Sequence, residues 1–179
     1  MNPAPHRTPT RQAPRFAAAT RRPATSRAIP SACCESVSAT KPRLDRLLVD
    51  TGFLVAYGRA ADPLHTKAGA FLRSFTGALV TVAPVIVETC FFLDMRAKQL
   101  LLEWAHEGSL AVVDVPVAAY PDLSATLGKY ASRKVDLADA ALVWLAGESG
   151  LRRILTVDRG DFSLFRLKGG RRFELIDWM

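Results

Sequence analysis

The stretch RLLVDT, residues 46–51, decides the fold. A short run of large apolar side chains ends in an acid, Asp50, without any polar alternation. A strand of a parallel sheet is covered on both faces and therefore shows in the sequence as a continuous apolar run, so a buried parallel strand is predicted here. Asp50 should then emerge at the carboxyl edge of the sheet, which is where such sheets bind ligands.

Apolar runs alternate with helical patterns through the rest of the chain. Further strands are predicted at 77–82, 110–116, 153–158 and 173–178. Helices are predicted at 62–75 (with Asp62 as cap and Pro63 in the first turn), 84–108, 120–132 and 135–150, the last closed by Gly150. The segment 84–108 is expected to hold two helices opened by Pro84, although its β-branched start would also suit a strand. The alternation predicts an α/β fold, a three-layer α/β/α sandwich around a mainly parallel sheet.

Residues 1–43 differ sharply in composition from the rest of the chain. They hold eight basic residues and one acid, and this surplus equals the net charge of +7 of the whole 179-residue chain. The segment is rich in Pro, Ala, Arg, Ser and Thr and is predicted to be a disordered basic tail before one domain at 44–179. A transit peptide, a start site placed too far upstream and an arm that touches RNA all remain open for the tail. The neutral domain gives no charge signal for nucleic acid.

The spacing of the cysteines and the length of the uncharged stretches indicate where in the cell the chain is expected. Cys33, Cys34 and Cys90 form no CxxC or other metal-ligand spacing, so a reducing, cytoplasmic location is expected. The longest stretch without a charge, 74–87, has 14 residues, which is short of the roughly 20 that span a bilayer. No association with a membrane is expected.

Two acids end strands and two begin a helix. Asp50 and Asp158 each follow an apolar strand, although a strand-end aspartate is also a common turn or cap residue. Asp136 lies at the start of the 135–150 helix and resembles the first half of a capping box, which we favour as its role. Asp139 points the same way and is flanked by alanines, which leave room for a charged ligand.

Glu88 interrupts the apolar run VAPVIVETCFF. An isolated buried carboxylate is costly unless it is paired or binds a metal. Arg96 and Arg133 are the candidate ion-pair partners if its role is only structural.

The four acids Asp50, Glu88, Asp139 and Asp158 suggest one site if they converge. Two carboxylates about 4 Å apart repel by roughly 4 kcal/mol at an effective dielectric of 20, so such a cluster needs a cation. Oxygen ligands alone favour Mg²⁺ or Mn²⁺ over zinc, and such a site suits hydrolysis of phosphodiesters. The sequence names no general base.

The ordered set LLVDTGFLVA, VIVETCFFL, VDLADAALVWLA and ILTVDRGDF resembles the acidic motifs of PIN-domain nucleases. The resemblance covers about residues 46–177 and is strongest to the toxin ribonucleases of VapBC-type toxin–antitoxin pairs. It implies that Asp50, Glu88, Asp139 and Asp158 bind Mg²⁺ or Mn²⁺, that Asp161 is an additional acid and that Thr51 is the small hydroxyl residue after the first acid. It also implies an RNA substrate, a homodimer and a co-encoded antitoxin. The long basic tail departs from the family pattern.

Three other functions compete with that of a metal-dependent ribonuclease. A PIN-like module that binds RNA or protein without cutting would need the acids not to converge. A phosphatase of the haloacid dehalogenase type would also place an aspartate after the first strand, but it normally has a second one where this chain has Gly52. A signalling receiver domain would need paired acids after that strand.

Overall fold

The computed structural model describes residues 45–179. The predicted disordered tail, 1–43, lies outside the described residues, so the proposed domain boundary at residue 44 stays a prediction.

A five-stranded, fully parallel sheet forms the centre of the domain. Its strand order is β3-β2-β1-β4-β5, with β1 between β2 and β4. The strands are β1 (Arg46–Val49), β2 (Ala78–Val82), β3 (Leu110–Val113), β4 (Arg153–Leu155) and β5 (Glu174–Leu175). Leu47, Leu48 and Val49 are fully buried, as the continuous apolar run of β1 predicts.

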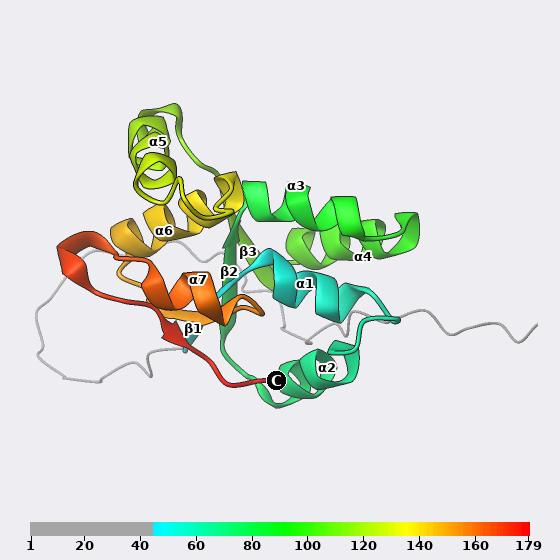
Figure 1. The fold of residues 1–179 in the computed structure, drawn as a ribbon. Coiled ribbons are helices and arrows are strands. Elements are labelled where there is room, and N and C mark those ends of the chain that lie inside the picture. Colours follow the sequence, from blue (N-terminus) through cyan, green and yellow to red (C-terminus); the bar gives the residue numbers. More distant parts are fainter. Residues whose placement is uncertain (1–44) are drawn as a thin grey trace, which may run out of the picture.

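Helices cover both faces of the sheet, which confirms the predicted three-layer sandwich. Figure 1 shows α1 to α4 on one side of the strands and α5 to α7 on the other. The helices are α1 (Thr51–Gly58), α2 (His65–Ser74), α3 (Ala83–Phe92), α4 (Met95–His106), α5 (Tyr120–Lys129), α6 (Leu137–Ser149) and α7 (Arg159–Leu164), with short 3₁₀ turns at Val117–Ala119 and Lys168–Gly170. No helix within residues 45–179 is long and apolar enough to cross a bilayer.

The element boundaries correct several predictions. The helix α1 was not predicted, because its buried residues, among them Phe53, Leu54 and Ala56, leave little of the polar face that marks an amphipathic helix. The six-residue helix α7 follows the predicted strand and is too short to show a helical period. The strand predicted at 153–158 is shorter in the structure, because β4 ends at Leu155. The helix α2 begins at His65 rather than at the predicted cap, because Asp62 accepts a hydrogen bond from the backbone N–H of Leu64 in the preceding turn.

The structure confirms the two helices predicted in 84–108 and the end of the 135–150 helix at Gly150. The segment 84–108 forms two helices, with Pro84 in the first turn of α3 and Asp94 capping α4 through a 2.8 Å hydrogen bond from the backbone N–H of Ala97. Gly150 ends α6 with a left-handed φ of 73°, which a residue with a side chain would adopt only at a cost. Together these elements place the start of α1, the second turn of α3 and the start of α6 near the carboxyl ends of β1 and β2.

Candidate active site

Asp50 lies at the carboxyl end of β1 and caps α1. Its Oδ1 accepts a 2.7 Å hydrogen bond from the backbone N–H of Thr51, and its Oδ2 accepts one of 2.8 Å from the hydroxyl of Thr156. Only 7% of the residue is exposed. Burial, with a smaller contribution from the charge of Asp136, raises the pKa of Asp50 from 3.8 to about 6. The carboxyl is therefore held in a place that disfavours its charged form.

Glu88 lies in the second turn of α3 and faces the start of α1. Its Oε2 accepts a 2.6 Å hydrogen bond from the hydroxyl of Thr51. Burial raises the pKa of Glu88, and the charges of Asp136 and Asp50 raise it further. No ion pair of Glu88 occurs among the described residues. Arg133, one of its two predicted partners, pairs with Asp161 instead.

The start of α6 supplies two more acids. Asp136 caps the helix by accepting hydrogen bonds from the backbone N–H groups of Ala138 and Asp139, and the Asp139 carboxylate accepts one from the backbone N–H of Asp136. The predicted capping box is thus confirmed. Burial first, then the charges of Asp136, Asp50 and Glu88, raises the pKa of Asp139 from 3.8 to about 7. Asp136 therefore caps the helix and also adds to the negative charge of the site.

Asp50, Glu88 and Asp139 thus come together from β1, α3 and α6, with Asp136 beside them. Burial is the largest cause of the raised pKa of each of the three, and the charge of Asp136 raises all three further, as does that of Asp50 for Glu88 and Asp139. As the side chains stand, no group of three or more His, Cys, Asp or Glu residues within 45–179 is arranged to hold a metal ion. The hydroxyls of Thr51 and Thr156 occupy one oxygen each of Glu88 and Asp50.

Asp158 and Asp161 follow β4, and their side chains make a helix cap and an ion pair. The Oδ1 of Asp158 accepts a 2.9 Å hydrogen bond from the backbone N–H of Asp161 and caps α7, and the Asp161 carboxylate lies 2.5 Å from Arg133. Among the described residues, no hydrogen bond joins the carboxylate of Asp158 to Asp50, Glu88 or Asp139. Thr156 connects the two regions, because its hydroxyl bonds both the carboxylate of Asp50 and the backbone N–H of Asp158.

Thr156 is a site residue that the sequence reasoning missed. Its hydroxyl donates to Asp50 and accepts a 2.9 Å hydrogen bond from the backbone N–H of Asp158, while its carbonyl accepts one of 3.2 Å from the indole N–H of Trp178. It is 1% exposed. The one available signal was a hydroxyl side chain in the apolar run RILTVD, two residues before the strand-end acid.

Gly52 stands where a haloacid dehalogenase-type phosphatase normally has its second aspartate, and the packing around it leaves little room for a side chain. A Cβ atom at this position would lie 2.1 Å from Cγ2 of Val157, so the backbone has no room for the second aspartate that a haloacid dehalogenase-type site needs. The glycine allows α1 to approach the end of β4 closely.

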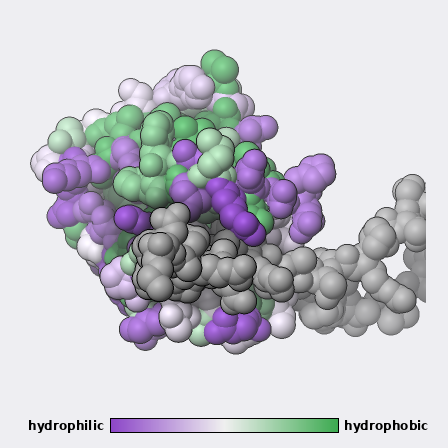
Figure 2. Space-filling model, turned by 90° about the vertical axis from the view of Figure 1, so that its right-hand side faces the viewer, coloured by the Kyte–Doolittle hydropathy of each residue, from purple (hydrophilic) through white to green (hydrophobic). Residues whose placement is uncertain are grey.

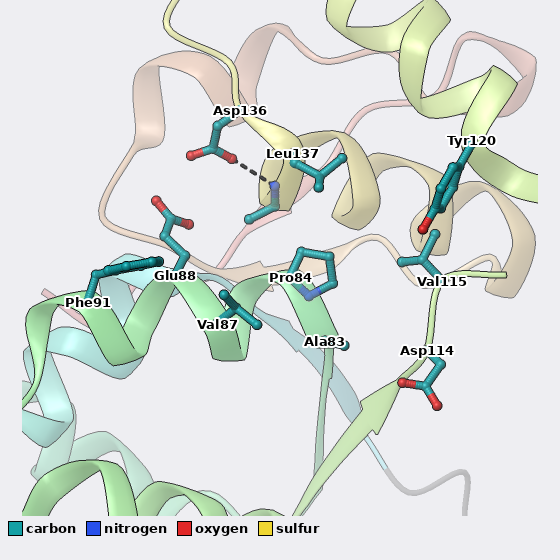
Figure 3. A pocket seen from close by; sticks show the side chains of 11 residues that line it. Ala83, Pro84, Val87, Glu88, Phe91, Asp114, Val115, Tyr120, Asp136 and Leu137 are labelled. Atoms are coloured by element: carbon teal, nitrogen blue, oxygen red, sulfur yellow. Dashed lines mark hydrogen bonds between the residues drawn. The ribbon is translucent and has the colours of Figure 1, made fainter. Parts of the chain in front are cut away.

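A cavity of about 640 Å³ opens beside the acids. Figure 3 shows Glu88 and Asp136 at one end, Tyr120 and Asp114 at the other, and Val87 and Pro84 of α3 between them. Of the site's acids, Glu88 and Asp136 therefore line a pocket whose walls are mostly apolar.

Known proteins are similar to this chain in sequence and in fold. No protein-family model matches the chain. Ribonuclease VapC26 of Mycobacterium tuberculosis is 32% identical over 134 residues, which cover 73% of this chain and 99% of the relative. The crystal structure of VapC20 of Mycobacterium tuberculosis, a toxin that cleaves the sarcin-ricin loop, has the same fold with a TM-score of 0.59 at 22% identity, over 64% of this chain and 91% of that one. The chain belongs to the VapC family of PIN-domain toxin ribonucleases.

Proposed function

We propose that this chain hydrolyses RNA phosphodiester bonds with a divalent cation, Mg²⁺ or Mn²⁺, held by Asp50, Glu88 and Asp139. The observation that carries the proposal is that three buried or half-buried carboxylates from β1, α3 and α6 have raised pKa values, first because of burial and then because of the charges of neighbouring acids. A divalent cation among them would replace repulsion by attraction, and an all-oxygen set of ligands suits the hard cations. When bound, the cation would lower the pKa of a water molecule and clamp the phosphate oxygens.

The remaining residues of the site position the acids. Thr51 and Thr156 each fix one oxygen of a carboxylate and leave the other oxygen to a ligand. The capping box fixes the start of α6 and holds one oxygen of Asp139 at the backbone N–H of Asp136. The predicted metal role of Asp158 stays a prediction, since its carboxylate would have to leave the cap of α7.

Cleavage of total RNA tests this proposal. The purified chain is incubated with RNA and Mg²⁺ or Mn²⁺, with and without EDTA, beside Asp50→Asn and the matched variant Asp122→Asn. Asp122 is an exposed acid in the first turn of α5, away from the cluster. We expect discrete products from the wild type and from Asp122→Asn, and none with EDTA or from Asp50→Asn. A folded wild type that binds RNA but cuts it with neither metal would point instead to a non-catalytic PIN-like module.

Family membership also supports proposals about partners and location. We propose that the chain is the toxin of a toxin–antitoxin pair, that it forms a homodimer and that an antitoxin protein inhibits it. Figure 2 shows hydrophobic surface in the upper half of this face of the molecule. Phe92 of α3 and Met95 and Leu102 of α4 are exposed large hydrophobic residues. These side chains fit a protein partner. The free thiol of Cys90 is consistent with the reducing cytoplasm that we expect.

A further inference from the structure

The cavity beside the acid cluster carries negative charge that the described part of the chain does not balance. Its charged lining residues are Glu88, Asp114 and Asp136, and no basic residue of 45–179 lines it. Asp114, which follows β3, is exposed, and none of the three acids forms an ion pair within 45–179. The cavity therefore attracts a cationic group from outside the described domain.

Exposed aromatic rings lie beside these acids. Phe91 of α3 is 81% exposed and Tyr120 at the start of α5 is 57% exposed, and both line the cavity. Figure 3 places Phe91 next to Glu88 and Tyr120 at the far end. The guanidinium of an arginine bonds carboxylates and stacks on aromatic faces, while its aliphatic stem packs on apolar surface such as that of Val87. The lining of the cavity thus suits arginine side chains.

The segment 7–27 of the same chain is rich in arginine. It contains six arginines and no acid, and Phe16 is its one large apolar residue. Such a sequence has little to bury against the exposed apolar residues of α3 and α4 that lie outside the cavity. Its charge complements that of the cavity, whereas the phosphates of RNA have the same sign as the acids. The segment is therefore the better partner for the cavity when no metal is bound.

The chain between this segment and the domain is long enough to reach the cavity. About 18 residues separate residue 27 from residue 45, and they span up to about 60 Å when extended. A globular domain of the size of 45–179 is about 35 to 40 Å across. The chain enters β1 at the amino edge of the sheet, and the cavity lies beyond the carboxyl ends of β2 and β3, so one width of the domain has to be crossed.

We propose that the segment 7–27 docks in this cavity and inhibits its own chain. Arginines of the segment lie against Asp114 and Glu88 and stack on Phe91 or Tyr120, so the segment covers the approach to the acid cluster. A polyanion that draws the arginines away opens the site. The inhibitory consequence rests on the proposed ribonuclease function, whereas the docking itself does not.

Binding of a peptide to the full chain tests the docking without requiring cleavage. A fluorescein-labelled peptide of residues 7–27 is titrated in EDTA at about 0.05 M salt, where charges are weakly screened. It is titrated with the wild type and with a neutralised chain, in which the six arginines of this segment are replaced by glutamine. Phe91→Ala and Asp114→Asn are added to the neutralised chain. Their matched controls are Phe92→Ala and Asp122→Asn, which change exposed residues of α3 and α5 outside the cavity.

We expect the peptide to bind the neutralised chain at least about tenfold more tightly than the wild type, because a tethered segment competes at high effective concentration. Phe91→Ala and Asp114→Asn should each weaken binding about two- to fivefold, as loss of an exposed cation–π contact or ion pair does. The two control variants should bind like the neutralised chain. Equal binding by the wild type and the neutralised chain would overturn the inference. Equal binding by the cavity and control variants would also overturn it, because the peptide would then bind elsewhere.

Cleavage of total RNA tests the inhibitory consequence separately. The neutralised chain should cut RNA several times faster than the wild type under the same conditions. Slower cleavage by the neutralised chain would overturn the inhibition and show that the arginines serve to bind RNA. If neither chain cuts RNA, the proposed ribonuclease function fails, and the peptide titration still decides whether the segment docks.

Discussion

The letters Val-Asp occur near two strand ends, and the two aspartates have opposite surroundings: Asp50 directly follows β1, whereas Asp158 lies three residues beyond Leu155, the last residue of β4. Asp50 follows β1 in the centre of the sheet, where α3 and α6 pack over it, so it is buried among other acids. Asp158 follows β4, is exposed and caps α7 next to an ion pair between Arg133 and Asp161. The difference shows that a strand-end acid becomes a candidate ligand through what packs over the strand end. The motif itself is the same in both places.

The largest expected effect separates these two aspartates directly. Asp50→Asn should weaken Mn²⁺ binding by more than about 100-fold, because even the residues that support ligands are worth 10- to 100-fold in metal sites. Asp158→Asn should weaken it by less than about tenfold, since its carboxylate already accepts the backbone N–H of Asp161. Calorimetric titration of both variants with Mn²⁺ measures this. Equal losses would mean that the cap of α7 opens and that Asp158 joins the ligands, which would break the comparison.

Thr156 connects the two regions, and its hydroxyl should be the next most sensitive group. Thr156→Val keeps the shape but removes the donor to Asp50, so Mn²⁺ affinity should fall about 10- to 100-fold. Thr81→Val is the matched control, because Thr81 is also fully buried but donates to the backbone carbonyl of Val49. Thr156→Ser should restore affinity. If both valine variants lose stability equally and neither changes Mn²⁺ affinity, Thr156 is only part of the core.

The raised pKa values predict how the stability of the metal-free chain depends on pH. In the folded state Asp50 and Asp139 keep their protons up to about pH 6 and 7, whereas an unfolded aspartate releases its proton near 3.8. Between about pH 4 and 7 the folded state therefore binds more protons, and the free energy of unfolding falls as the pH rises. For Asp50 the rise in pKa corresponds to about 3 kcal/mol at full ionisation.

Denaturant unfolding in EDTA at pH 5 and pH 8 checks this prediction. The chain should be less stable at pH 8, and Mg²⁺ or Mn²⁺ should restore stability at pH 8 while having little effect at pH 5. Asp139→Asn should flatten the dependence. Greater stability at pH 8 than at pH 5 without metal would show that the acids around Asp50 do not repel one another as described.

The smallest effect is expected at the exposed ion pair between Arg133 and Asp161, next to Asp158. Arg133→Ala removes the partner of Asp161, but both side chains reach solvent, so the free energy of unfolding should change by less than about 1 kcal/mol. RNA cleavage should stay within a few-fold of the wild type. A large loss of cleavage with unchanged stability would move Asp161 from a surface ion pair into the active site.

The sequence by itself determined the class of fold, and it named the candidate acids of the site. Continuous apolar runs such as RLLVDT specify buried parallel strands because such strands are covered on both faces. The capping box of α6 and the left-handed Gly150 follow from local backbone chemistry, which needs no knowledge of the rest of the chain. The site prediction around Asp50, Glu88 and Asp139 used strand ends and one acid out of place in an apolar run, and the structure brings these three together.

Only the tertiary structure decided which strand-end acid lies in the cluster and what holds it. The helix α1 has almost no polar face to mark it, and its position depends on the close approach of Gly52 to Val157. Thr156 contacts Asp50 across 106 positions of sequence, and no local pattern encodes such a pairing. The surroundings of Asp50 and Asp158 differ because strand order, a property of the whole chain, puts β1 in the centre of the sheet and β4 nearer its edge.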